Sequence, residues 1–258
     1  TGNITLDAGN DLDVNAAVTT GGLGTLYMVA VNNITVADSL VTTSGVVLVD
    51  AGLNLTLEAA ITSTSGDIGL IAGDSLDLAS GGDVMTGGDV LLEAGTDLIM
   101  VSGAEVAATG DVVGQSLDGN LSLGVISGAN VALAASNGIL DANGGLLNIT
   151  ADNLSLRADR DLIGSHDDTS VVPGFNVNAI DVSVKKLAAS SDSGIYLSEA
   201  DGLAVTSVAA LTVNLASALR SNFNSTTSSV ARTRTTSALD DLSTTTDGPI
   251  KLVSESGS

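Results

Sequence analysis

The sequence lacks cysteine and tryptophan and has few aromatic residues of any kind. Its 258 residues include no Cys, no Trp, two Tyr and two Phe. The absence of cysteine excludes a disulfide framework and thiolate metal sites. Because large rings normally help to fill a globular core, an interior of Val, Leu, Ile and Ala predicts a thin, repetitive core instead.

Proline is nearly absent as well, occurring only at Pro173 and Pro249. Proline removes a hydrogen-bond donor from a sheet, so its scarcity fits a chain built mostly from central strands. No apolar run approaches the ~18 residues of a membrane-spanning helix, and we expect no membrane insertion. No signal peptide is visible at Thr1, so any export signal is expected outside this segment.

Basic residues are missing from the first part of the chain. Residues 1–156 contain no Lys or Arg, and the formal net charge of the whole chain is -22. Such an acidic surface repels nucleic acid and anionic lipid, so we expect neither as a partner. An acidic surface favours solubility, and it is compatible with salt-rich surroundings or with the binding of cations.

What the sequence does contain is an internal repeat. Each repeat begins with a glycine, at spacings of 21 or 22 residues: Gly2, Gly24, Gly45, Gly66, Gly88 and Gly110. The shared template is G-x-I-x-L-x-A-G-x-[DNS]-L-x-[LV], which holds two stretches of alternating apolar residues, and a third short strand follows. A repeat of this length leaves no room for a crossover helix, so the chain is expected to coil upon itself.

We therefore predict an all-β fold, a right-handed parallel β-helix (β-solenoid) with about 21–22 residues per turn and irregular excursions in the C-terminal half. Turns stacked about 4.8 Å apart, about twelve in number, would make a rod about 55–60 Å long. At the corner formed by each Ala-Gly pair, such as Ala51-Gly52, glycine is expected to supply backbone angles that other residues avoid.

Stacking should convert positions of the repeat into columns of side chains. One aliphatic column is predicted in the interior, from Ile4, Leu26, Val47, Ile68, Val90 and Val112. A polar column is predicted at the second corner, from Asp11, Asn33, Asn54, Ser75, Asp97 and Asn120. We also expect five further side chains to be buried inside: Leu6, Val14, Leu48, Leu70 and Leu92.

Regularity divides the chain into four parts. Residues 1–128 form regular turns, and residues 129–216 continue the solenoid less regularly, with an excursion at 164–178. Residues 217–247 are rich in Ser and Thr and are predicted to form a long loop or a small lateral subdomain. Residues 248–258 return to solenoid strand and stop in mid-turn.

Two expectations about contacts follow. Arg220, Arg232 and Arg234 lie in the irregular stretch, where we expect them to be free to reach a neighbouring molecule. Strands of the template run to both ends without a polar cap, so the segment is expected to be part of a longer rod or a unit that stacks end to end.

The template resembles the shafts of filamentous-haemagglutinin-like exoproteins and other giant bacterial surface adhesins. The segment Ser65–Asp74, SGDIGLIAGD, is typical of those shafts, and the resemblance is good over 1–128 and patchy over 129–258. It implies a right-handed β-helix, secretion across a Gram-negative envelope to the extracellular surface of a bacterium, and a role as a stalk or adhesin.

The expected function is mechanical: a structural or adhesive rod that is not an enzyme and needs no cofactor. Its expected partners are further copies or repeats of the same protein, joined end to end, and host or matrix polysaccharide or protein. Two alternatives stay open. One is a carbohydrate-active β-helix enzyme, a polysaccharide lyase or hydrolase, and the other is a ligand-binding module that uses residues 164–178 and 217–247.

Two local groups were considered as catalytic residues. Arg157, Asp159 and Asp161 would share one face of a strand, as basic and acidic groups do in sugar-cleaving enzymes, but a solvated cluster of ion pairs explains them more simply. His166, the only histidine, lies beside two aspartates in sequence. Adjacent residues cannot converge as a nucleophile, base and orienting group, so a solvated loop histidine is expected.

A metal site is a further hypothesis. Asp67, Asp89 and Asp111 each follow a template glycine at spacings of 22, so they would lie about 4.8 Å apart in the stack. A hard cation such as Ca²⁺ would relieve the repulsion among the three carboxylates. The alternative is an exposed acidic ladder that is screened by water and binds no metal.

Overall fold

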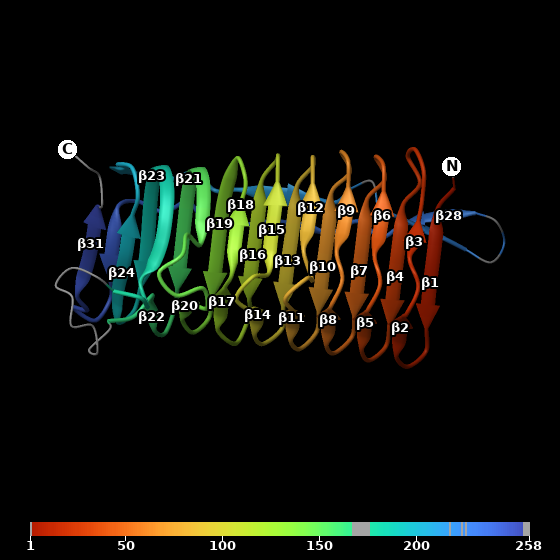
Figure 1. Ribbon diagram of the computed structural model, residues 1–258, viewed down its shortest axis with the longest axis horizontal. Coiled ribbons are helices and arrows are strands. Elements are labelled where there is room, and N and C mark those ends of the chain that lie inside the picture. The colour runs from red at the N-terminus through yellow and green to blue at the C-terminus, as the bar shows by residue number, and fades with distance from the viewer. Residues whose placement is uncertain (1, 167–175, 217, 223, 225, 255–258) are drawn as a thin grey trace.

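The protein is an elongated right-handed β-solenoid, seen in a computed structural model whose strands stack along one axis (Figure 1). The structure describes residues 2–166, 176–216, 218–222, 224 and 226–254. Among these residues there is no helix, and 27 strands join in one continuous sheet in which the pairings are parallel. The fold class predicted from the repeat is confirmed.

Each turn contributes strands to three columns. The first column contains β1 (Ile4–Ala8), β4 (Leu26–Ala30), β7 (Val47–Ala51), β10 (Ile68–Ala72), β13 (Val90–Ala94), β16 (Val112–Ser116) and β19 (Asn130–Ala135). The second contains β2 (Leu12–Val14), β5 (Ile34–Val36), β8 (Leu55–Leu57), β11 (Leu76–Leu78), β14 (Leu98–Met100), β17 (Leu121–Leu123), β20 (Ile139–Asp141) and β22 (Leu162–Ile163). The third contains β3 (Val18–Thr19), β6 (Leu40–Thr42), β9 (Ile61–Ser63), β12 (Val84–Thr86), β15 (Glu105–Ala108) and β18 (Val125–Ser127).

The later turns lose a corner. The long strands β21 (Ile149–Ala158) and β23 (Ile180–Ser191) run from the third column into the first, and β24 (Gly194–Glu199) and β31 (Ile250–Ser254) run from the second into the third. Earlier turns have a glycine at the corner between the third and first columns, as at Gly110, whereas β21 and β23 carry no glycine there. The strand therefore continues through the bend.

The corner glycines are required because successive turns approach each other closely. A Cβ atom on Gly52 would lie 1.9 Å from the carbonyl oxygen of Val31 in the preceding turn, and one on Gly45 would lie 1.9 Å from that of Gly24. Gly45 and Gly52 are not among the residues with positive φ. The prediction that the corner glycine supplies unusual backbone angles is therefore wrong at Gly52, where contact between turns excludes a side chain.

The predicted aliphatic column is confirmed by the register of the first column, in which its six members are stacked partners. Of the other side chains expected inside, Val14, Leu70 and Leu92 are buried in the main core and Leu6 is partly buried against it. Leu48 is a correction. It is fully buried but belongs to a second cluster outside the solenoid, because side chains alternate along β7 and its neighbours Val47 and Val49 point inward.

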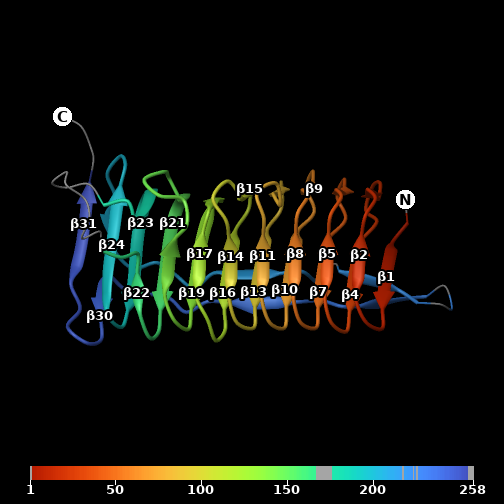
Figure 2. The same ribbon diagram turned by 60° about the horizontal axis from the view of Figure 1, so that its bottom comes forward.

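The chain makes about nine turns rather than the twelve expected, and residues 206–241, which leave the spiral, account for part of the difference. The short strands β25 (Ala204–Val205) and β30 (Leu242–Thr244) pair in succession with the same strand, β23. The intervening residues are thus an insertion within one strand of the last turn. Figure 2 shows this insertion as a hairpin along the outside of the rod, running back to β1.

The lateral segment therefore begins before the predicted range of 217–247 and ends inside it. Its apolar residues alternate like those of a solenoid strand, so this pattern alone does not separate residues 206–216 from the spiral. The predicted return at 248–258 corresponds to β31, and residues 255–258 lie outside the described part of the chain. Most of the predicted excursion at 164–178, residues 167–175, also lies outside it.

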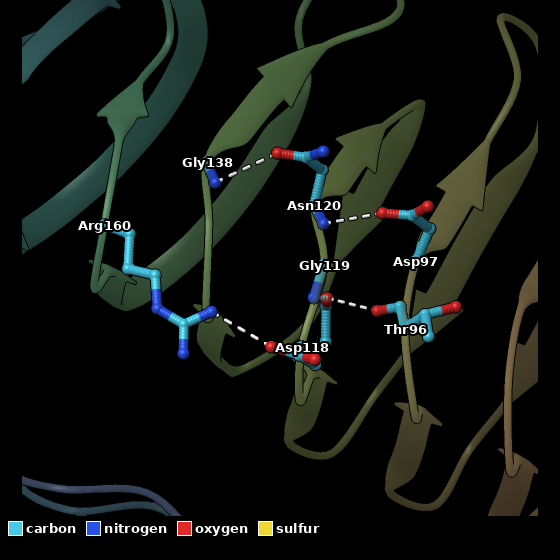
Figure 3. A network of polar contacts seen from close by, with 8 residues as sticks. Thr96, Asp97, Asp118, Gly119, Asn120, Gly138 and Arg160 are labelled. Atoms are coloured by element: carbon cyan, nitrogen blue, oxygen red, sulfur yellow. Dashed lines mark hydrogen bonds and ion pairs between the residues drawn. The ribbon is translucent and has the colours of Figure 1, made fainter.

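The polar column at the second corner forms as predicted. The Asn33 side-chain amide donates to Asp11 Oδ1 at 2.9 Å, and that of Asn54 donates to Asn33 Oδ1 at 3.0 Å. Further along, the Asn120 backbone N–H donates to Asp97 Oδ1 at 2.7 Å (Figure 3). Most of these side chains thus satisfy a group of the next turn, whereas the Ser75 hydroxyl donates to Asp77 of its own turn. The column stabilises the stack along its axis.

A charge in the interior should unfold the rod. We predict that Val90→Asp lowers the free energy of unfolding by more than about 3 kcal/mol, because the carboxylate would be buried with no partner. Urea unfolding followed by circular dichroism measures this change. The matched control is Met85→Asp at a position that is 39% exposed, and equal, small effects of both substitutions would contradict the assignment of Val90 to the interior.

Candidate functional site: a strap on the outer face of the rod

The first column presents two rows of outward-facing side chains. The apolar row runs through Tyr27, Leu48, Gly69, Leu91 and Val113. The acidic row alternates acidic and apolar residues, through Asp7, Val29, Asp50, Ile71 and Glu93. The three acids are separated by two turns each, which gives the acidic row a regular spacing of negative charge.

The hairpin insertion, residues 206–241, covers these rows, and we call it the strap. Its strands are β26 (Thr212–Asn214), β27 (Leu219–Ser221), β28 (Thr227–Ser229) and β29 (Thr233–Thr235). β26 pairs with β29 and β27 with β28, all antiparallel. Near its base the backbones of Val208 and Leu239 exchange two hydrogen bonds, at 2.8 and 3.0 Å. The strap is therefore one long hairpin lying along the rod axis.

The strap packs on the apolar row through its own alternating apolar residues. Val213, Leu215 and Ala218 are fully buried and form one cluster with members of that row. At Gly69 the strap leaves no room for a side chain, because a Cβ there would lie 2.3 Å from Leu215 Cδ1. The missing side chain at Gly69 makes a depression into which Leu215 fits.

Arginines of the strap pair with all three carboxylates of the acidic row. These pairs join Arg220 to Asp7, Arg232 to Asp50 and Arg234 to Glu93. The exposed fraction of the acidic side chain falls from 38% at Asp7 to 18% at Asp50 and 9% at Glu93.

The Arg234 pair is bidentate, with Nη2 2.6 Å from Glu93 Oε1 and Nε donating to Oε2. This hydrogen bonding to Glu93 raises the pKa of Arg234, although burial opposes the rise. Burial raises the pKa of the nearby Tyr27 phenol, and the charge of Asp50 adds to that effect. The docked strap thus holds Arg234 charged and paired with Glu93, and burial favours the neutral form of the Tyr27 phenol.

The expectation that these three arginines are free to reach a neighbour is wrong, because their own chain supplies the carboxylates. Sequence reasoning placed the acids and the arginines in different parts of the chain and did not connect them. The spacing of these residues in the sequence does indicate the pairing. Asp7, Asp50 and Glu93 recur at 43 residues, and Arg232 and Arg234 lie two apart on one face of a strand.

The three aspartates of the metal hypothesis form a ladder, since their turns are in register. The backbone N–H of Asp89 donates to Asp67 Oδ1 at 2.9 Å, and that of Asp111 donates to Asp89 Oδ1 at 2.8 Å. Burial raises the pKa of the Asp89 carboxyl, the hydrogen bond from Asp111 opposes this, and the charges of Asp67 and Asp111 raise it further. Backbone donors relieve part of the repulsion that the sequence predicts.

The ladder continues into residues that the sequence reasoning missed. The side-chain amide of Asn130 donates to Asp111 Oδ1 at 2.7 Å, and that of Asn153 donates to Asn130 Oδ1 at 2.5 Å. Lys186 is the next residue in register after Asn153. The column therefore passes from carboxylates through amides to an ammonium group. The spacings in this part of the chain depart from the repeat in both directions, which concealed the register.

The residues considered for catalysis are mostly engaged in exposed ion pairs. Arg157 Nε lies 2.6 Å from Asp159 Oδ1, and Arg160 Nη1 lies 3.0 Å from Asp118 Oδ1 (Figure 3). No pair that the structure describes joins Asp161 to them. The His166 ring lies 6.0 Å from that of Tyr196, edge to face.

Within the described ranges, no group of three or more His, Asp or Glu side chains is arranged to hold a metal ion. The calcium hypothesis at Asp67, Asp89 and Asp111 stays a prediction. The described residues also contain no helix that is long and apolar enough to cross a membrane.

We compared the chain with protein-family models, with curated proteins and with solved structures, and none of the three comparisons gave a match. The resemblance to filamentous-haemagglutinin-like exoproteins therefore rests on the template residues alone.

The most buried ion pair should contribute most to docking of the strap. We predict that Arg234→Gln destabilises the protein by about 1–2 kcal/mol, because it leaves a nearly buried carboxylate without its partner. Arg220→Gln should cost less than about 1 kcal/mol, since Asp7 is hydrated. Urea unfolding and amide hydrogen exchange of the strap measure the loss of stability in each of the two variants. Arg160→Gln, which removes an exposed pair, is the control, and equal losses in all three variants would refute the proposed order.

The acidic ladder should cost stability at neutral pH. The raised pKa of Asp89 means that the folded state binds the proton more tightly than the unfolded state. Stability is then greatest below the ordinary value of 3.8 and falls as pH rises through the folded-state pKa. Asp89→Asn should therefore stabilise the protein by less than about 1 kcal/mol at pH 7 and have no effect near pH 3. Thermal melts at the two pH values measure this, and destabilisation at pH 7 would contradict it.

The same variant tests the calcium hypothesis. If the ladder binds Ca²⁺, a chelator at low salt should lower the melting temperature of the wild type, and it should lower that of Asp89→Asn less. Identical wild-type melts with and without chelator would support the ladder without metal.

Proposed function

We propose that the chain is a structural or adhesive rod within a large secreted surface protein of a bacterium. The observation that carries this proposal is the unbroken axial stack, in which strand pairing continues from β1 through every turn to β31. The interior is filled by one continuous aliphatic cluster along the stack. Such a body becomes longer with each added turn, which is what a stalk requires.

The strap supports a mechanical role because it ties distant turns together. A solenoid turn ordinarily contacts only its neighbours, so stability is shared locally along the stack. Here a segment rooted in the last turn reaches the first, where the Ser221 backbone N–H donates to Thr5 Oγ1 at 2.7 Å. Separating the turns along the axis would therefore also require breaking the contacts of the strap.

The proposed partners are further repeats or copies of the protein along the axis, together with host or matrix polysaccharide or protein. Apolar side chains of both end turns are only partly buried, among them Ile4 and Leu12 in the first turn and Leu252 in the last. A stacked turn, from the same polypeptide or from a second copy, would cover them. The proposal includes no catalytic step.

The proposed location at the bacterial cell surface can be tested on the cells that produce the protein. Immunogold labelling with an antibody to this chain should place the label on thin fibres projecting from the cell surface. Label confined to the cell interior would contradict the proposal.

The catalytic alternative is tested with the purified chain and a panel of acidic and neutral polysaccharides. A rod should release neither reducing ends nor unsaturated uronic acid products. Their release by the wild type would overturn the proposal in favour of a polysaccharide hydrolase or lyase.

A further inference from the structure

Two lysines differ from the other basic side chains of the protein. Six of the eight basic residues form ion pairs with carboxylates, namely Arg157, Arg160, Lys185, Arg220, Arg232 and Arg234. For Lys186 and Lys251, no carboxylate of the described part of the chain lies within ion-pair distance. Each of them lines a cavity. In a chain with a net charge of -22, an unpaired ammonium group beside a cavity is a specific attraction for an anion.

The cavity beside Lys186 lies between the rod and the base of the strap and has a volume of about 590 Å³, which is within the usual size of ligand pockets. The rod contributes Asn130, Val131, Ala132, Asn153 and Lys186 to its lining. The strap contributes Ser207, Val208, Ala209, Ala210, Leu211 and Ala238. We call this cavity the strap cleft.

The cleft exists because the apolar row changes in size along the rod. Under the middle of the strap the row carries Leu48 and Leu91, but its continuation is Ala132, Ser155 and Ala188, of which Ala132 lines the cleft. The hydrogen bonds between its two strands hold the base of the strap together over these small residues. Space is therefore left beneath it, where larger side chains would have filled the gap.

The polar wall of the cleft is the end of the axial ladder. One amide proton of Asn153 is used by Asn130, which leaves further donor and acceptor capacity on Asn153. Lys186 follows in register, its backbone one strand spacing away, and its exposed side chain lines the cleft. Val208 and Leu211 supply apolar surface on the strap side. The cleft thus offers a cation, amide groups and an aliphatic wall.

We propose that the strap cleft binds a uronic acid residue of an acidic saccharide. Its carboxylate would pair with Lys186, its hydroxyl groups would bond to Asn153, and its C–H face would lie on Val208 and Leu211. An inorganic anion would use the lysine alone and leave the aliphatic wall exposed. The proposal names a ligand class for the adhesive role. The binding itself does not depend on the protein being an adhesive rod; only the biological purpose of the binding rests on that proposed function.

Isothermal titration with a galacturonic acid trisaccharide tests the proposal on the intact chain. The wild type should bind it, and the neutral galactose trisaccharide should bind at least 10-fold more weakly. Lys186→Gln should weaken binding of the acidic sugar at least 10-fold. The matched control is Lys185→Gln, which removes the adjacent charge at the Asp152 pair outside the cleft, and it should change affinity less than 2-fold.

A cleft-filling variant gives a second, independent test. Ala132→Leu should abolish binding by occupying the floor of the cleft while leaving Lys186 in place. Circular dichroism checks that each variant is folded.

Three results would overturn the proposal: no binding by the wild type at millimolar sugar, equal losses in the two lysine variants, or equal binding of the neutral trisaccharide. None of them bears on the immunogold result, so failure of the cleft and failure of the rod are distinguishable.

Discussion

Close approach of backbone to backbone between successive turns is the constraint on which the rest of this structure depends. At Gly45 and Gly52 no side chain fits, because the carbonyl oxygen of the preceding turn occupies the place of a Cβ atom. Once the corners are fixed in this way, each position of the repeat lies directly above its equivalent, and the side chains form axial rows. The side chains of the protein therefore act in rows: an aliphatic interior, amide and carboxylate ladders at the corners, and two outward-facing rows on the first column.

Rows of acidic residues concentrate negative charge, and the protein compensates this charge in two ways. Inside the acidic ladder, backbone N–H groups and the amide of Asn130 donate to carboxylate oxygens, and the amide of Asn153 donates in turn to the Asn130 oxygen. On the outer face, the strap brings arginines to the acidic row, and the burial of Glu93 beneath Arg234 makes that contact charge-dependent as well as apolar. Residues 1–156, which contain no Lys or Arg, thus obtain cations from a segment that follows them in sequence.

The repeat predicted the fold class, the interior column and the polar ladder, because a period of 21 or 22 residues specifies which side chains stack. It could not predict the strap, since the alternation of Leu211, Val213 and Leu215 is the same whether a strand enters a solenoid or lies across its outside. Leu48 is a different case: it directly follows Val47 of the interior column, so strand alternation alone already points it outward. The strap cleft was also beyond prediction, because it arises where an insertion crosses a row of small residues. The acidic ladder was predicted, but its continuation to Lys186 was hidden by the irregular spacing of the later turns.

In this structure the chain leaves the solenoid within its last turn, runs along the outside of the rod to the first turn and comes back. Because the native protein has no cysteine, the double variant Thr5→Cys, Ser221→Cys tests this directly. Mild oxidation should form an intramolecular disulfide, seen as a monomer that migrates faster in a non-reducing gel. A control that pairs Thr5→Cys with Thr109→Cys should remain unlinked. Failure of the first pair to link within one chain would contradict the account.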